Sequence, residues 1–310
     1  MSTFSAYGMG PKGFLVHRPL NDDEIANHFD IHRRASQRVH YDLSLTKLNS
    51  TFVECVDKWY SMRGFLAMAG SIVSVVLGFV VCFCLYATFN SGFLGFLGPA
   101  LLAALGLCFP LKMLLSDAFT YTHYPIRFNR RNRQVYAFRR DGTVLKAGWE
   151  DFYWTIYNTK IGLGGGDLNV MGHLLDKDGI TIRESIGLSL VDAGESGKQN
   201  ILQCFEFLRR YMQEGPGPVL EALKPVPLIM LPGIHKTKET WLFGWQHLTN
   251  GMKGMPVFQI LFQPFLFPIS LFRWIVMRTS KIPHWPQWVE DECRIDPDDP
   301  WIRDERHAAR

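Results

Sequence analysis

The sequence predicts a membrane protein of the α+β class. A two-helix transmembrane hairpin is followed by a small antiparallel β domain with a C-terminal helix, and then by an apolar interfacial segment. Three observations predict this: an uncharged stretch between Arg63 and Lys112, a period-two pattern after Thr122, and an aromatic, proline-rich end. We expect four regions: a cytoplasmic N-terminal region (1–63), the hairpin (64–116), a cytoplasmic β domain (120–215) and a membrane-associated C-terminal region (216–310).

The uncharged stretch is long enough for two spanning helices, since one crossing of the hydrocarbon core takes about 20 apolar residues. Asn90-Ser91-Gly92 is the turn-prone triplet inside it. We therefore expect helices over Phe65–Phe89 and Phe93–Leu115. The alternative is a buried helical hairpin in a soluble core, which is disfavoured because such core helices rarely run this long without a charge.

The short, uncharged turn requires both ends of the hairpin to lie on the same side of the membrane. Positively charged residues beside spanning segments stay in the cytoplasm. Such residues flank the hairpin on both sides: Arg33, Arg34, Arg38, Lys47, Lys58 and Arg63 before it, and Lys112, Arg127, Arg130, Arg131, Arg133, Arg139 and Arg140 after it. Both flanks are therefore expected to be cytoplasmic.

Small residues mark helix-packing positions in the hairpin. Gly70, Ser74 and Gly78 recur every four residues in the first helix, and Gly95 begins a similar set in the second. Such a stripe lets another helix backbone approach closely. The simplest partner is the other helix of the hairpin; a second copy of the chain or a foreign membrane protein is the alternative. The hairpin contains no ionisable acid, arginine or histidine, which argues against an ion or proton pathway.

After Thr122, apolar residues alternate and turn residues separate the runs, with Asp141-Gly142 as a strong hairpin signal. Strands are expected near 126–128, 135–138, 144–145, 152–158, 168–175 and 180–186. A helix from Ser196 should follow and stop at Gly215-Pro216.

Basic residues beside the hairpin are expected to face the membrane surface. The formal net charge is +4. Each basic residue close to anionic headgroups contributes about 1 kcal/mol. The predicted membrane-surface residues are Arg127, Arg130, Arg131 and Arg133. The positive-inside rule already accounts for these charges, so no nucleic-acid partner is expected.

Metal, cofactor and catalytic patterns are weak. The six cysteines include no Cys-x-x-Cys pair, so neither disulfides nor a thiolate zinc site is indicated. A helix from Asn21 would put His28 and His32 on one face, with Glu24 as a possible third ligand. Surface or headgroup-facing histidines are favoured over a metal pair, because Phe29 stands where the zinc motif needs a glutamate and Arg33 and Arg34 would repel a cation.

Two further patterns resemble sites without completing them. The glycine-rich run 162–167 lacks the lysine and Ser/Thr of a phosphate loop and suits a flexible β-loop. Glu150 and Asp151 would point to opposite faces of a strand, so a turn or strand-start role is favoured over a carboxylate pair. We predict no enzyme activity and no cofactor.

The segment 255–277 is long enough to span a membrane, yet it contains Gln259, Gln263, Arg273 and three prolines. Positive residues also lie on both sides of it. An interfacial or re-entrant position is therefore favoured over a third span. The acidic, tryptophan-containing end could dock on the β domain or on a partner.

Three motifs suggest a fold resemblance: Ile126-Arg127-Phe128-Asn129, Gln134-Val135-Tyr136 and Trp149-Glu150-Asp151. With the strand run and its closing helix, residues 120–215 resemble the pleckstrin-homology-like (PH-like) domains that bacterial membrane proteins carry beside transmembrane hairpins. This implies a small antiparallel barrel or sheet capped by the helix.

With Pro283-His284-Trp285-Pro286, the whole arrangement resembles an uncharacterised bacterial inner-membrane family found near type VI secretion effector genes. The resemblance implies a multi-pass inner-membrane protein with cytoplasmic termini. It also implies an immunity protein that neutralises a toxin by direct binding, with membrane lipids and a cognate toxin or effector as partners. The alternatives are a membrane-active effector or its adaptor, and a lipid-binding scaffold.

Overall fold

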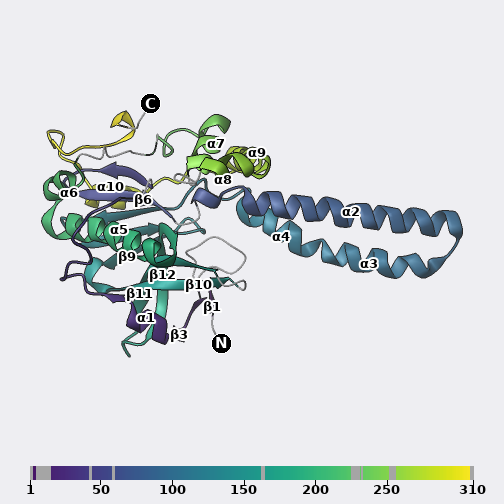
Figure 1. The fold of residues 1–310 in the computed structure, drawn as a ribbon, viewed down its shortest axis with the longest axis horizontal. Helices are drawn as coiled ribbons and strands as arrows, with labels where there is room; N and C mark the ends of the chain where they lie inside the picture. Colours follow the sequence, from purple (N-terminus) through teal and green to yellow (C-terminus); the bar gives the residue numbers. More distant parts are fainter. Residues whose placement is uncertain are drawn as a thin grey trace.

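A long helical hairpin projects from a body built of two antiparallel sheets and several helices (Figure 1). The computed structural model describes residues 3–4, 15–41, 44–57, 60–161, 165–224, 231, 233–250 and 256–307. Residues 162–164 of the glycine-rich run and Met255 at the start of the predicted interfacial segment lie outside the described residues.

The hairpin consists of two helical arms, as predicted. The first is α2 (Phe65–Ser91), and the second is η2 (Leu94–Phe96), α3 (Leu97–Gly106) and α4 (Cys108–Asp117). Gly92 joins the arms with a left-handed backbone, φ 69°, a conformation that glycine adopts without steric cost. The second arm is interrupted at Leu107 because Pro110 cannot donate a hydrogen bond to the carbonyl of Gly106.

Both arms are apolar and exposed. Val75 and Phe79 on α2 are each 72% exposed, and Leu101 and Leu102 on α3 are similarly open. Within the described residues, the two arms with their flanking turns are the helices long and apolar enough to cross a membrane, over Tyr60–Ser91 and Leu94–Asp117. The prediction of two long apolar helices is therefore confirmed.

The hairpin is inserted between two paired strands of the first sheet. This sheet has the order β5-β6-β7-β8-β9, with β5 at Leu45–Leu48, β6 at Phe52–Val56, β7 at Pro125–Asn129, β8 at Gln134–Phe138 and β9 at Val144–Gly148. β6 precedes the hairpin and β7 follows it, yet they pair antiparallel from Phe52–Asn129 to Val56–Pro125. The β domain expected over 120–215 thus shares its sheet with strands from the N-terminal region.

The second sheet has the order β3-β12-β11-β10-β4 and is also antiparallel. Its three long strands are β10 (Phe152–Ile161), β11 (Gly165–Leu175) and β12 (Thr181–Ala193), and the short edge strands are β3 (Arg18–Pro19) and β4 (His28–Phe29). β1 (Thr3–Phe4) pairs separately with β2 (Leu15–Val16). The glycines of the predicted loop at 165–166 belong to β11.

Helix α5 (Gly194–Glu214) covers the core between the sheets. Its Phe205 stacks on Phe29 of β4 and lies near Trp149 and Trp154, which are both fully buried. The short helix α6 (Pro216–Ala222) follows immediately. The two sheets are not closed into a barrel, so the barrel form of the fold prediction is wrong; the antiparallel strands and closing helix are as predicted.

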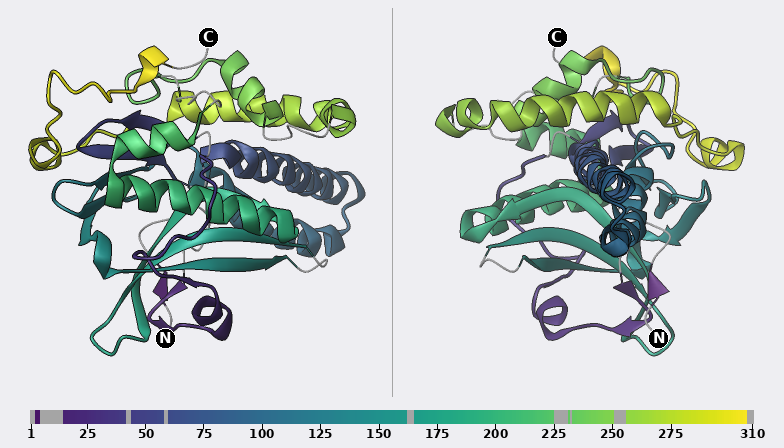
Figure 2. Two further views of the ribbon diagram at one scale, coloured as in Figure 1. Left: turned by 60° about the vertical axis from the view of Figure 1, so that its left-hand side comes forward. Right: turned by 90° about the vertical axis from the view of Figure 1, so that its right-hand side faces the viewer.

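The C-terminal region forms helices α7 (Trp241–Asn250), α8 (Pro256–Leu261), α9 (Gln263–Thr279) and α10 (Gln287–Glu292), with a final turn η4 (Glu305–His307). Viewed along the hairpin, the yellow-green α9 lies across the hairpin's base rather than alongside its arms (Figure 2, right). An interfacial segment would take this direction, and its contact with a membrane stays a prediction.

Candidate functional sites at the hairpin base and in a polar cleft

A buried ion pair holds the two ends of the hairpin together. The Asp117 carboxylate, at the end of α4, accepts hydrogen bonds from the backbone N–H of Gly64 (2.8 Å) and of Ala67 (3.4 Å) at the start of α2. Arg63 donates to the Asp117 carbonyl (2.9 Å) and carboxylate (3.2 Å), and both side chains are fully buried. An acid at a helix N-terminus and a cation at a C-terminus each complement the helix dipole.

A second buried pair attaches α9 to this base. Arg273 of α9 donates to both carboxylate oxygens of Glu239 at 2.9 Å and to the carbonyl of Tyr60 at 2.6 Å. The Tyr60 hydroxyl donates to the same Glu239 carboxylate. Burial favours the neutral form of Glu239, but the Arg273 guanidinium outweighs burial and lowers the pKa of that carboxyl.

A third buried pair attaches the C-terminal segment to the first sheet. Arg127 on β7 donates to Glu54 on β6 (2.9 Å) and to Glu290 on α10 (3.1 Å). Its guanidinium lies between the rings of Phe52 and Trp285. Burial would raise the pKa of Glu54, but Arg127 lowers it to about 2. Arg127 is therefore an interior residue, and its predicted place at the membrane surface is wrong.

The other predicted surface arginines lie in the turn between β7 and β8, because β7 runs away from the hairpin. Arg133 donates to the carbonyl of Met212 (2.7 Å) and pairs with Glu150. Arg130 lies against Gly215 at the start of α6, and Arg131 is exposed. Figure 1 shows α6 and α10 at the end of the molecule away from the hairpin. A membrane crossed by the hairpin would not contact this turn.

The small residues of the hairpin do not share one packing role. A Cβ on Gly70 would lie 2.9 Å from the backbone N of Leu114 and still closer to the carbonyl oxygen of Pro110, so α2 and α4 touch there. Ser74 has a buried hydroxyl in the same arm. A Cβ on Gly78 would meet nothing within 4 Å, and the three atoms nearest a Cβ on Gly95 belong to Phe93 of its own turn. The partner of Gly70 is therefore the other arm.

Gly70→Ile is expected to lower the free energy of unfolding by about 1–3 kcal/mol, because the arms must separate to admit the side chain. Gly78→Ile is the matched control, since its site is open. Thermal unfolding of the purified full-length protein in detergent measures both. Equal losses would contradict the packing seen at Gly70.

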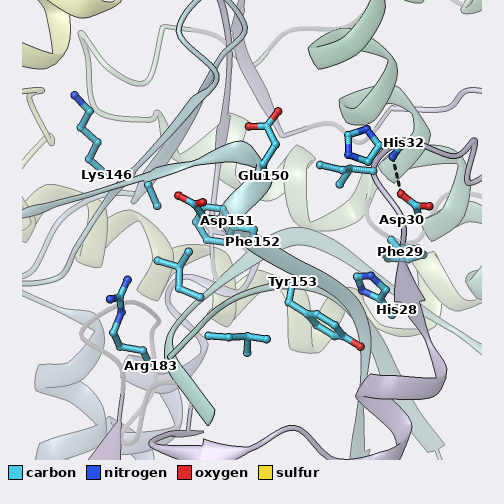
Figure 3. A pocket seen from close by; sticks show the side chains of 14 residues that line it. His28, Phe29, Asp30, His32, Lys146, Glu150, Asp151, Phe152, Tyr153 and Arg183 are labelled. Atoms are coloured by element: carbon cyan, nitrogen blue, oxygen red, sulfur yellow. Dashed lines mark hydrogen bonds between the residues drawn. The ribbon is translucent and has the colours of Figure 1, made fainter. Parts of the chain in front are cut away.

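A polar cleft of about 640 Å³ opens between the two sheets (Figure 3). None of its 14 lining residues belongs to the hairpin. Its charged and polar side chains come from the segment after α1 (Asp22–Ala26), from β9 and the following turn η3 (Trp149–Asp151), and from the long strands: His28, Asp30, His32, Lys146, Glu150, Asp151, Tyr153 and Arg183. Its volume is in the range of ligand pockets.

Several groups in the cleft are held in place by neighbours. The His28 ring stacks on Tyr153 at 4.0 Å, and its Nδ1 lies 3.0 Å from the Trp154 carbonyl. The Asp151 carboxylate accepts from the N–H of Gly148 at 3.0 Å, which confirms its predicted turn role. Glu150 and Asp151 nevertheless line one cleft, because they lie in η3 rather than in a strand.

The histidine pair is not a helical metal site. α1 starts with the predicted cap, Asn21, but ends at Ala26, so His28 lies in β4. Glu24 points elsewhere and pairs with Arg18. Among the described residues, no group of three or more histidine, cysteine or acidic side chains could hold a metal ion.

A serine–histidine–glutamate chain lies inside the second sheet. The Ser185 hydroxyl is 2.8 Å from Nδ1 of His173, and Nε2 of His173 is 3.3 Å from Glu24. All three side chains are buried, so no substrate can reach the hydroxyl. Burial would raise the pKa of Glu24, but hydrogen bonds from Arg18 and His173 lower it to about 2. The contacts of Glu24 with His173 and Arg18 connect α1 to the second sheet.

A family model described as a family of unknown function, DUF6708, matches residues 103–297, more than half of the chain. The chain belongs to the DUF6708 family. No curated protein and no solved structure matches it significantly.

The DUF6708 match begins in α3 and ends just after α10, so it includes β7–β12, α5 and the C-terminal helices. The match leaves out β5, β6 and α2. Those elements nevertheless complete its first sheet and its hairpin.

Sequence reasoning missed Asp117, Glu239 and Glu54 as partners of the buried arginines. A signal was present for one of them: Asp117 is the first acid after the hairpin, as Arg63 is the last base before it.

Proposed function

We propose that this protein is a non-enzymatic membrane protein of the bacterial inner membrane, which holds a binding domain at the cytoplasmic surface. The observation that carries the proposal is the insertion of an apolar, outward-facing hairpin between two paired strands, with its ends joined by Arg63 and Asp117. In water, this hairpin would expose its leucines, valines and phenylalanines. In a bilayer, the same side chains face lipid, and the helices satisfy their own backbone hydrogen bonds.

The proposed topology places both termini in the cytoplasm. Both arms return to one base, from which the whole body extends (Figure 1). Exposed basic residues at this end, such as Lys112, Arg278 and Lys281, suit the cytoplasmic side.

The binding domain is proposed to be PH-like. Strands β6–β9 form one antiparallel meander, β10–β12 form another, and α5 follows. Seven strands in two sheets followed by a helix is the order expected of such a domain, with the transmembrane hairpin occupying the connection between its first two strands. A bridge between Asp57 and Leu188 brings the first strand's end to the last strand.

We further propose that the bound partner is a toxin delivered by a type VI secretion system, so that the protein confers immunity. The polar cleft is the favoured contact, since it presents both signs of charge and stands apart from the hairpin. The exposed Arg183 of β12 contributes a cation to it.

A growth assay tests this proposal. The chain is expressed alone, the gene beside it alone, and both together, with the neighbour's product directed to the cytoplasm or to the periplasm. We expect the neighbour to be toxic and this chain to restore growth. Arg183→Glu should weaken the rescue, while Lys177→Glu, an exposed turn substitution outside the cleft, should not.

The other outcomes overturn the proposal. Growth inhibition by this chain alone would make it a membrane-active effector. No effect of any combination would reject immunity and leave a membrane-bound scaffold. Unchanged rescue by Arg183→Glu would move the toxin contact away from the cleft.

A further inference from the structure

We propose that α8 and α9 (256–279) form a lipid-facing collar, lying in the headgroup region of the bilayer that the hairpin crosses. The side chains of Phe267, Leu271 and Trp274 would insert between lipids. The inference rests on the proposed membrane insertion of the hairpin and adds a second, independent contact with the same bilayer.

Helix α9 carries large apolar side chains on its exposed face, whereas its buried face combines polar residues with Leu266, Val276 and Met277. Its exposed face carries Phe267 (52% exposed), Leu271 (43%) and Trp274 (38%), which follow one another at helical spacing. Its buried face includes Ser270 and Arg273, both at 0% exposure. A helix of a soluble protein places its apolar stripe inward and its polar face in water.

The polar side chains of the collar are satisfied inside the protein. Arg273 pairs with Glu239, and Ser270 accepts a hydrogen bond from the Trp241 indole at 3.0 Å. The Gln263 side chain accepts from the Trp245 indole at 3.0 Å, and the Gln259 amide donates to the Thr249 carbonyl at 3.1 Å. Of the residues that argue against a third span in the sequence, Arg273 is thus buried, and Gln259 and Gln263 are half-buried with partners inside the protein. The outward surface extends from α9 along α8 through Val257, Ile260 and Leu261.

The position of α9 matches the level of the headgroups. It packs on the first turns of α2, where Val276 joins Ala67 and Ala118 in a small core. α2 has 27 residues. At about 1.5 Å per residue it is about 40 Å long, whereas the hydrocarbon core measures about 30 Å. About 10 Å of α2 therefore remains outside the hydrocarbon, roughly the diameter of one helix lying across it.

The positive charge of Arg278 at the end of the collar is also consistent with a position in the headgroup region. The Arg278 guanidinium lies 5.8 Å from the centre of the Trp274 ring, and both side chains are exposed. Tryptophan is enriched at the membrane–water interface, and arginine there can reach lipid phosphates. The bilayer is the occupant that this surface fits, because α9 packs directly on the base of the hairpin, whose arms are apolar and exposed as well.

Fluorescence quenching by brominated lipids tests the collar in the full-length protein. Vesicles of phosphatidylcholine and phosphatidylglycerol are prepared with and without bromine on the acyl chains. The emission intensity of Trp274 is obtained by subtracting the emission of the Trp274→Phe variant from that of the unmodified protein. The emission of Trp288 on α10, from Trp288→Phe, is the matched control, since Trp288 is similarly exposed (42%) at the end away from the hairpin.

We expect brominated chains to reduce the Trp274 emission several-fold and to leave the Trp288 emission unchanged. Flotation of the same vesicles reports whether the protein is membrane-bound. Failure to float would overturn the proposed membrane insertion and the collar together. Flotation with unquenched Trp274 would overturn the collar alone, and crosslinked dimers in that sample would assign the surface to a second copy.

Discussion

Arg127→Ala is expected to lower the free energy of unfolding by about 3–5 kcal/mol, the range for removing one partner of a buried ion pair. The substitution leaves Glu54 buried without its principal cation and removes one of the residues that join β7 to α10. Thermal unfolding in detergent measures the loss. Limited proteolysis should cut the C-terminal segment faster, because Glu290 loses its contact with the sheet.

The loss should also depend on pH. In the unmodified protein the pKa of Glu54 is about 2, so its pairing stabilises the fold above the ordinary value of 4.5 and is lost as the pH falls toward 2. Without Arg127, we expect burial to raise that pKa, so that the folded variant loses stability as the pH rises. The difference between the two proteins should therefore be larger at pH 7 than at pH 4.

Arg131→Ala is the control, since Arg131 is exposed in the adjoining turn and a surface substitution changes stability by no more than about 0.5 kcal/mol. If Arg127→Ala and Arg131→Ala unfolded alike at pH 7, the buried pair would not carry the stability assigned to it.

Asp117→Ala is expected to cost a similar 3–5 kcal/mol, because Arg63 becomes an unpaired buried charge and two N–H groups of α2 lose their acceptor. The double variant Arg63→Leu with Asp117→Leu should be more stable than Asp117→Ala, since no buried charge remains. Unfolding in detergent compares the three proteins, and the exposed Lys112→Ala of α4 serves as the control.

A double variant less stable than Asp117→Ala would contradict this account. It would mean that the hydrogen bonds at the ends of the two helices matter more than the compensation of charge.

The hairpin could be predicted because its signal is local. An uncharged stretch, a turn triplet and the length of a bilayer crossing are all contained within one window of sequence. The strands after Thr122 were likewise predictable from alternation and turns. The pairing of β6 with β7 was not, because no local pattern indicates that residues on either side of the hairpin will be neighbours.

The error at Arg127 has a specific physical origin. Alternation along β7 turns Ile126 and Phe128 into the core and Arg127 to the other face, which would be a surface in an isolated sheet. The C-terminal segment covers that face with Trp285 and α10. The acidic, tryptophan-containing end was recognised as a docking element, but its docking site lies about 160 residues earlier in the chain.

The arginine in α9 was misleading in a different way. Arg273 disfavours a lipid environment when it is counted along the sequence, but its partner Glu239 lies 34 residues before it and removes the charge from the surface. Composition could not reveal which face of the helix this arginine occupies. The contacts of its guanidinium do.

If the hairpin crosses a bilayer as proposed, its placement between β6 and β7 makes the folding of the body conditional on membrane topology. During synthesis, β6 leaves the ribosome first. It cannot pair with β7 until both arms of the hairpin have been synthesised, because β7 follows them in the chain. If one arm failed to cross back, β7 would remain on the other side of the bilayer from β6, and the first sheet could not assemble. Only a chain with both arms inserted correctly can complete the first sheet and bury its core, and a buried core resists proteases. Correctly and incorrectly inserted chains would therefore differ in protease resistance.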